Sequence, residues 1–229
     1  MKFKDFETIM SASRLQRYVD ACDGDTRKAM TLYRKNLHLS QDIFIIISCF
    51  EVALRNAIDR TLTTNIGAEW LRDSSLAGGL FDNHPCHKTC SIIRHAYDKR
   101  LRDHTYTHEQ LLSDMEFGVW KYMFAPNEYR STGRCLLSVF PNKPTSTAIT
   151  QYNNKYIFNE LDKINTLRNR IAHHEPVCFG FNSATIDVTY VMQQYTRIQT
   201  LFHWMGVNSN KLLYGLDHIA HVCQDLQKM

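Results

Sequence analysis

Apolar residues recur along most of the chain with the spacing of an amphipathic α-helix. Near the N-terminus one such face holds Phe6, Ile9, Met10, Leu15 and Val19. The same periodicity predicts helices over about 3–22, 25–38, 41–65, 88–103, 108–125, 150–174, 184–205 and 210–227. A shorter helix is expected between Pro126 and the turn at 140–144, and Asp25 and Ser40 are expected to cap the second and third helices.

The third predicted helix is apolar on all sides in its first half, where the sequence reads IFIIISCF at 43–50. A helix of this kind is usually the central, buried one of a helical protein. The run is too short to span a bilayer and is flanked by Asp42 and Glu51. The first ten residues, MKFKDFETIM, contain no apolar signal core. We therefore expect a cytoplasmic protein with no membrane partner.

Few residues that favour sharp turns are present, because the chain of 229 residues holds only 9 glycines and 5 prolines. This scarcity favours long helices over a sheet with many strands. The segment 66–88 carries three of the glycines and is expected to be an irregular connection. The segment ATIDVTYV at 184–191 is rich in β-branched residues but is expected to be helical. With no repeat or linker, the prediction is one all-α domain over residues 1–229, with about 7–9 helices.

The overall charge is mildly basic, at +4 with histidines neutral. Such a balance permits an anionic partner such as RNA without requiring one. The seven cysteines are odd in number and irregularly spaced. In a cytosolic protein they are expected to be reduced thiols rather than a disulfide framework.

The stretch NTLRNRIAHHEPV at 165–177 concentrates titratable and hydrogen-bonding side chains within about two helical turns. Asn169 and His173 are i,i+4 neighbours, and the long side chain of Arg168 can reach the same site. Pro176 disfavours helical geometry at the residue before it, so the helix is expected to end near His174.

These groups suit cleavage of a phosphodiester bond in RNA. Histidine can transfer protons, and arginine can contact the phosphate with two hydrogen bonds. No metal and no cofactor is required, because the nucleophile belongs to the substrate. The alternative is a helix terminus whose arginine and histidine are simply paired with neighbouring carboxylates.

An upstream stretch, FEVALRNAID at 50–59, repeats the Leu-Arg-Asn triplet. Glu51 and Arg55 have the spacing and order of a favourable helical ion pair, which could be purely structural. In the functional alternative, Glu51 orients Arg168 or His173, and Arg55 and Asn56 line the cleft.

A third stretch, HPCHKTCSIIRH at 84–95, mixes cysteine and histidine and raises the possibility of a zinc site. Its C-x-x-x-C spacing has no matching second pair, so no metal is expected. His104 and His108 form a looser pair that is expected to lie on the solvated surface. The tryptophans are expected to lie in the core, at Trp70, Trp120 and Trp204.

The motif LRNRIAHHEPV resembles the R-N-x-x-x-H signature of the HEPN superfamily, and specifically its Abi-like (abortive infection) bacterial proteins. Two further stretches are similar to blocks of that family. One is LYRKNLHLSQDIFIIISCFEVALRNAIDRTL at 32–62, and the other is LLSDMEFGVWKYMF at 111–124, around Gly118. Together the three stretches cover most of residues 30–180.

The resemblance implies a HEPN-like helical bundle and a homodimer in which the motifs of both protomers face one cleft. It also implies a metal-independent endoribonuclease that acts as a toxin or in phage defence, with an unknown antitoxin as a possible further partner. Arg168, Asn169 and His173 take the catalytic positions, and His174 is an ambiguous neighbour. A subgroup carries a tyrosine, modified by a partner nucleotidyltransferase, where this chain has Glu175. The alternative is a non-catalytic dimer of the same type that binds RNA or a protein.

Overall fold

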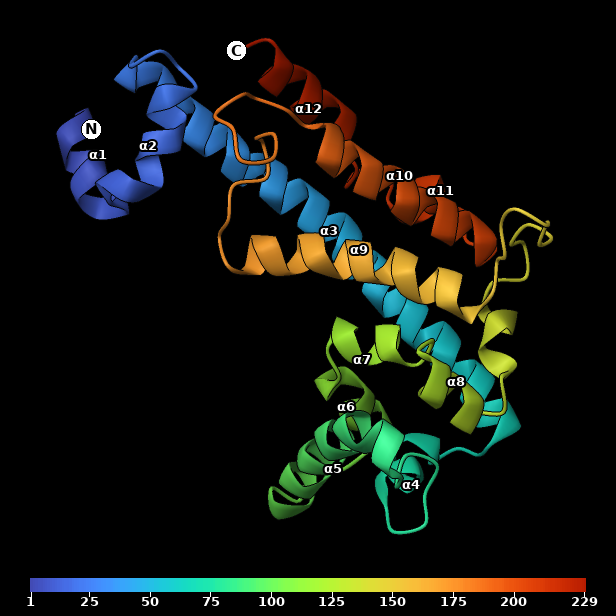
Figure 1. The fold of residues 1–229 in the computed structure, drawn as a ribbon. Helices are drawn as coiled ribbons and strands as arrows, with labels where there is room; N and C mark the ends of the chain where they lie inside the picture. Colours follow the sequence, from blue (N-terminus) through green and yellow to red (C-terminus); the bar gives the residue numbers. More distant parts are fainter. The chain divides into compact units, whose positions relative to one another are not determined.

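The computed structural model describes residues 1–229, and they form an all-helical protein (Figure 1). This confirms the predicted fold class. The helices are α1 (Phe3–Met10), α2 (Ala12–Asp20), α3 (Thr26–Asn65), α4 (Trp70–Ser75), α5 (His87–Arg102), α6 (His108–Asp114), α7 (Phe117–Tyr122), α8 (Pro126–Ser131), α9 (Asn154–Ala172), α10 (Thr189–Trp204), α11 (Ser209–Leu212) and α12 (Ile219–Gln227), with 3-10 turns at His84–Cys86 and Cys135–Val139.

There are more helices than predicted, because three of the predicted ones are divided and α4 lies in a segment that was not predicted to be helical. The first is interrupted at Ser11, whose φ of 71° lies outside the helical region. The second is interrupted between α6 and α7, where Met115 and Glu116 are extended. The third, over 210–227, is replaced by α11 and α12. None of these interruptions contains proline, and periodicity alone does not reveal them.

The two helices predicted over 25–38 and 41–65 are instead one continuous helix, α3, of 40 residues. Asp25 caps it as predicted, because its Oδ1 accepts hydrogen bonds from the backbone amides of Arg27 and Lys28, each at 3.0 Å. The prediction that Ser40 is a cap was wrong. Leu39 and Ile43, on either side of it, are fully buried, so packing carries the helix through the serine.

The other local predictions had mixed outcomes. Trp70, Trp120 and Trp204 are buried, as expected. The connection over 66–88 is less irregular than predicted, since it contains α4 and a 3-10 turn. The β-branched stretch at 184–191 forms no strand, although an isolated bridge joins Phe179 to Ile186 and α10 begins only at Thr189.

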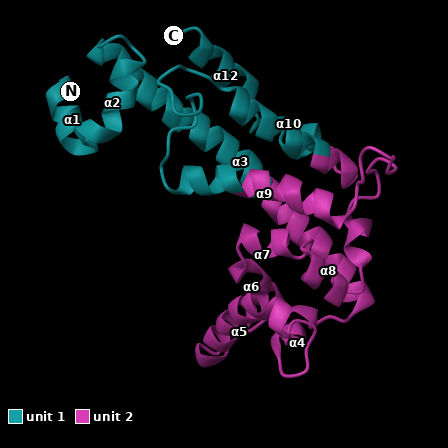
Figure 2. Ribbon diagram, in the orientation of Figure 1, with its two compact units in different colours: residues 1–49, 166–200, 209–229 teal, residues 50–165, 201–208 magenta.

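The chain forms two compact units (Figure 2). Unit 1 comprises residues 1–49, 166–200 and 209–229, and unit 2 comprises residues 50–165 and 201–208. The two longest helices, α3 and α9, each contribute residues to both units. Helix α3 is also the one helix that is long and apolar enough to cross a membrane by length and composition, a test that the core helices of soluble proteins pass as well.

An aromatic cluster forms the core of unit 1 beside the end of α9. The ring of Tyr18 in α2 meets the rings of Tyr33 in α3 and Phe179 edge-on, at 5.1 and 5.0 Å. Phe6 in α1 contacts Tyr33 in the same way at 5.4 Å. Burial raises the pKa of Tyr18 far above its ordinary range, and it raises the pKa of the neighbouring Cys178 thiol to about 12. The segment that follows α9 is thus anchored in an apolar core.

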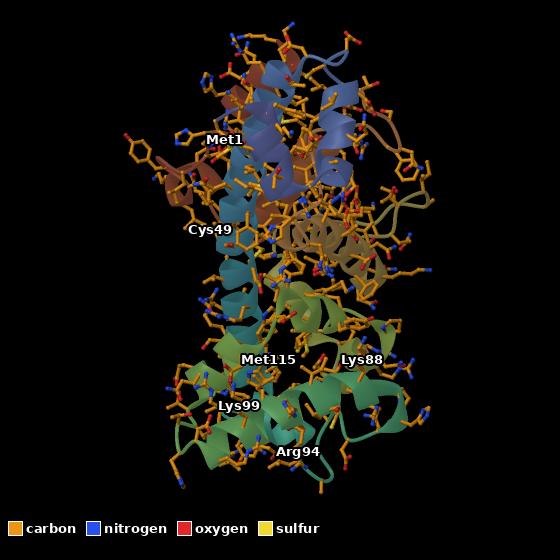
Figure 3. All side chains as sticks on the ribbon, turned by 90° about the vertical axis from the view of Figure 1, so that its left-hand side faces the viewer. Met1, Cys49, Lys88, Arg94, Lys99 and Met115 are labelled. Atoms are coloured by element: carbon orange, nitrogen blue, oxygen red, sulfur yellow. The ribbon has the colours of Figure 1, made fainter.

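Unit 2 has a second aromatic core. Phe50, at the start of its part of α3, contacts Phe202 edge-on at 5.2 Å and Phe117 of α7 at 6.3 Å. Helices α4, α5 and α6 pack on one another. The side chains of this unit, with Lys88, Arg94 and Lys99 of α5 labelled, are drawn in Figure 3.

Candidate functional site

The end of α9 carries the predicted motif in a tight helix-terminating turn. The helix ends at Ala172, and His174 adopts a left-handed conformation with a φ of 57°. The amide of Glu175 donates to the carbonyl of Arg170 at 2.8 Å, and the amide of His174 donates to the carbonyl of Ile171 at 2.9 Å. This pair of bonds defines a Schellman motif. The helix therefore ends where Pro176 predicted.

Arg170 stabilises this turn from within. Its Nη2 donates to the carbonyl of Pro176 at 2.7 Å, and its Nε lies 3.3 Å from Oε2 of Glu175. The guanidinium also sits over the ring of Tyr190, 5.1 Å from the centroid. Because its donors are already engaged, Arg170 has a structural role, unlike Arg168.

Distant residues of unit 1 fix the same turn from outside. Nη1 of Arg14, on α2, donates to the carbonyl of His174 at 2.8 Å. Oδ1 of Asn36, on α3, accepts from the amides of Val177 and Cys178 at 2.8 and 3.1 Å. Asn36 is buried, so its amide group depends on these partners. The turn is therefore held on both sides of His174.

A cavity of about 310 Å³ lies in unit 1 between the first half of α3 and this turn. Arg168, His174 and Glu175 supply its titratable groups. The remaining lining residues are Asn36, Leu37, Ser40, Gln41, Phe44, Ile171 and Ala172. One wall therefore carries a cation, an imidazole and a carboxylate, and the other is a mixture of amides, a hydroxyl and apolar groups.

Arg168 is the unusual member of this cavity. Its Nε is buried and has no hydrogen-bond partner. Leaving a buried donor unsatisfied costs about 1–3 kcal/mol, more when the group is charged. An anion bound in the cavity would remove this cost, and a phosphate fits the fork of the guanidinium.

The two histidines of the motif are separated by the left-handed turn. Both are exposed, but His174 lines the cavity and His173, the residue favoured by the spacing, does not. Asn169 is exposed on α9 and is also absent from the lining. The chain thus brings Arg168 together with His174 and Glu175, while Asn169 and His173 face solvent.

The upstream residues Glu51, Arg55 and Asn56 belong to unit 2. Nε of Arg55 donates to Oδ1 of Asn56 at 3.2 Å, and Glu51 is half-buried. Their predicted role toward the motif in unit 1 stays a prediction.

Unit 1 contains a second, larger cavity of about 660 Å³ that shares Glu175 with the first. Arg17 lines it, but its guanidinium is engaged by the carbonyls of Gly180 and Ser183, at 2.6 and 2.7 Å. Phe181 at its edge is almost fully exposed. The arginines here hold the loop together and leave few free donors for a ligand.

The region at 84–95 directs its thiols to different partners. Sγ of Cys86 lies 3.7 Å from Oγ of Ser131, and Cys90 donates to the carbonyl of Ser75 at 3.5 Å. No group of three or more His, Cys, Asp or Glu side chains in the chain has an arrangement that could hold a metal ion.

The expectation that His108 lies on the solvated surface was wrong. Its Nε2 is 2.8 Å from Oδ1 of Asp59, which also accepts a hydrogen bond from Nε1 of Trp70 at 2.8 Å. The imidazole is largely buried, with only 11% of the side chain exposed. The imidazole of His108 is buried behind Trp70, and Trp70 belongs to α4, a helix that the sequence did not predict.

The sequence did not indicate Arg14, Asn36 or Phe44 as parts of the site. Each lies more than 100 residues from the motif along the chain. For Asn36 the signal in the sequence was weak, since a single asparagine in a predicted helix only suggests a buried hydrogen bond. No protein-family model, curated protein or solved structure matches the chain.

Proposed function

We propose that the protein is a metal-independent endoribonuclease of the Abi-like HEPN type, acting as a toxin-like effector in phage defence. The observation that carries the proposal is the buried, unsatisfied Nε of Arg168 in a cavity that this residue shares with His174. A guanidinium with an unsatisfied buried donor, next to an imidazole that can transfer protons, suits a phosphodiester whose cleavage needs charge stabilisation and proton transfer.

In the proposed reaction, the 2′-hydroxyl of the RNA loses its proton and attacks the adjacent phosphorus. The new O2′–P bond forms as the P–O5′ bond breaks, and the leaving 5′-oxygen gains a proton. Arg168 contacts the phosphoryl oxygens, and a motif histidine transfers a proton. No residue of the cavity acts as a covalent nucleophile, so the attacking group comes from the RNA itself.

The proposal includes a homodimer that buries the 165–177 segment. One arginine and one cavity histidine make a sparse active site, whereas two protomers would supply a general acid, a general base and two cations. Leu37 and Phe44 line the cavity on α3 and are exposed at 46% and 40%. A self-complementary contact through these residues would bring the same patch of each protomer together, and it would place Asn169 and His173 within reach of a shared cleft.

The decisive experiment is cleavage of a labelled single-stranded RNA in EDTA. We expect the wild type to cut it, and Arg168→Ala to lose about 10²–10³-fold in rate, as for other groups that stabilise a transition-state charge. Arg27→Ala, at an exposed position of α3, is the matched control and should retain activity. Loss of wild-type cleavage in EDTA would contradict the proposal.

The products test the chemistry separately. They should carry a 2′,3′-cyclic phosphate, and a substrate with a 2′-O-methyl group at the cleaved position should remain intact. Efficient cutting of that blocked strand, or of DNA, would overturn 2′-hydroxyl attack while leaving a nuclease function open.

The second candidate is a non-catalytic dimer that binds RNA or a protein partner. Its support is the exposure of Asn169 and His173, which leaves the motif incomplete around the cavity of one protomer. RNA binding that Arg168→Ala weakens, together with no cleavage by the wild type, would favour it.

The proposed function places the protein in the cytoplasm, with RNA as its substrate. Expression of an active toxin should arrest growth of a bacterial host, and Arg168→Ala should relieve the arrest. Any antitoxin would then be found as the RNA or protein that restores growth to cells expressing the wild type.

A further inference from the structure

Unit 2 holds a cavity of about 710 Å³ that the proposed nuclease site does not include. Its walls come mainly from α5, α7 and α8, and Asp114 of α6 and Asn165 of α9 also line it. A volume of this order is typical of a site for a small organic molecule.

The buried carboxylate of Glu128 points to the kind of ligand. Glu128 lines the cavity, and only 5% of the residue is exposed. Its Oε1 accepts a hydrogen bond from the hydroxyl of Thr89 at 2.7 Å, and it forms no ion pair. A buried carboxylate is normally paired with a cation or hydrogen-bonded by several donors. The remaining acceptor positions of Glu128 therefore suit a cationic, hydrogen-bonding group.

The other charges of the cavity leave a negative balance. Lys121 is bound to Asp162 at 2.7 Å, and Asp114 is bound to Arg100 at 2.6 Å. Besides the imidazole of His95, the ionisable lining groups outside these pairs are the carboxylates of Glu116 and Glu128 and the ammonium group of Lys88. Two negative charges against one positive charge favour a cation over an anion.

The rest of the cavity is suited to an apolar body. Ile92, Val119 and the ring of Tyr122 line it. Lysine ammonium groups lie near this ring, since Nζ of Lys121 is 4.8 Å and Nζ of Lys88 is 5.9 Å from its centroid. Aromatic and aliphatic surface beside a carboxylate matches a molecule that is apolar at one end and cationic at the other.

Gly118, the glycine at the centre of the 111–124 stretch, keeps this cavity open. It lies in α7 and lines the cavity, and a Cβ atom added to it would have no heavy atom within 4 Å. Its backbone needs no glycine, because its φ is not positive. A larger side chain at this position would therefore extend into free space rather than clash with the fold.

We propose that this cavity is a binding site for a small organic cation, with an amidine, guanidine or primary amine that binds Glu128 and an apolar or aromatic body that lies against Tyr122. A planar amidinium or guanidinium would form two parallel hydrogen bonds to the carboxylate. The proposal does not depend on ribonuclease activity.

Benzamidine is a suitable probe, because it joins an amidinium to a phenyl ring. Titration calorimetry on the full chain should give saturable binding of benzamidine at millimolar concentrations or below. Benzamide, which is neutral, should bind at least about tenfold more weakly, in line with the greater strength of charged hydrogen bonds. Benzoate, which is anionic, should not bind.

Two variants locate the site. Glu128→Gln retains an acceptor for Thr89 but removes the charge, and Gly118→Leu fills the cavity. Each should weaken benzamidine binding about tenfold or more. Asp103→Asn, at an exposed position outside the cavity, and Arg168→Ala in unit 1 should bind like the wild type.

Three results would overturn the proposal: no saturable binding to the wild type, equal binding of benzoate, or full binding by Gly118→Leu with an unchanged melting temperature. If Glu128→Gln fails to fold, Gly118→Leu still decides the question. Because Arg168→Ala is expected to bind the probe, failure of this proposal and failure of the nuclease proposal are distinguishable.

Discussion

The side-chain oxygen of Asn36 accepts a hydrogen bond from the backbone amide of Val177 at 2.8 Å, although 141 residues separate the two in sequence. Asn36 is only 3% exposed, so water does not compete for this bond. The contact joins the first half of α3 to the segment that leaves the motif. It fixes one edge of the cavity that Arg168 and His174 line.

Asn36→Ala should therefore lower the free energy of unfolding by about 1–3 kcal/mol, because two buried amides, those of Val177 and Cys178, lose their acceptor. Chemical denaturation measures the change. Thr31→Ala is the control, since Thr31 is exposed on the same helix and bonds only the carbonyl of Arg27 within it. Equal free energies of unfolding for the two variants would show that the hydrogen bonds accepted by Asn36 contribute nothing to stability.

The two motif histidines should differ in their effect on RNA cleavage. We expect His174→Ala to lower the rate by about 10²-fold or more, the scale of a general acid or base, because His174 lines the cavity with Arg168. His173→Ala should lower it less. The spacing of the motif instead predicts the larger loss for His173→Ala. Single-turnover rates of the two variants therefore decide which of the two histidines transfers the proton. A larger loss for His173→Ala would place the proton transfer in a cleft formed only by two protomers.

The exposed apolar wall of the cavity should be the dimer contact. Phe44→Glu would place a charge in that contact, so we expect a wild-type dimer at micromolar concentration and a monomeric variant in sedimentation velocity. Ile9→Glu, at an exposed position of α1, should remain dimeric. A monomeric wild type, or a dimeric Phe44→Glu, would contradict this interface.

The cap of α3 should make stability depend on pH. Hydrogen bonds from the amides of Lys28 and Arg27 lower the pKa of Asp25 below its value in the unfolded chain. The resulting stabilisation is present above the unfolded-state pKa of Asp, about 4, and is lost as the pH falls through the lower folded-state pKa. Melting temperatures of the wild type and Asp25→Asn should thus differ at neutral pH and converge in acid. A constant difference across that range would rule out the charge as its cause.

The outline of the fold was predictable because the signals involved are local. Helical periodicity identified an all-α chain, Asp25 marked the start of α3, and Pro176 marked the end of α9. Burial of the three tryptophans followed from side-chain chemistry alone. Each of these features depends on residues within a few positions of one another or on a single side chain.

The interruptions and continuations of helices were decided by packing. The sequence predicted that Ser40 caps a helix, but the burial of Leu39 and Ile43 keeps α3 continuous. The sequence predicted that His108 lies on the surface, but Asp59 and Trp70 enclose it. In both places tertiary contacts outweigh a local preference, and such preferences amount to only about 1 kcal/mol.

The candidate site shows most clearly which features follow from local sequence and which depend on tertiary contacts. The sequence by itself placed Arg168, His173 and His174 at the end of a helix, because a motif and a following proline are local features. Only the tertiary structure placed His174, rather than His173, in the cavity with Arg168. The physical reason is that the left-handed turn at His174 is held by Arg14 and Asn36, and the opposite wall is α3. Those residues approach the motif only when the chain folds, so no pattern within 165–177 could reveal them.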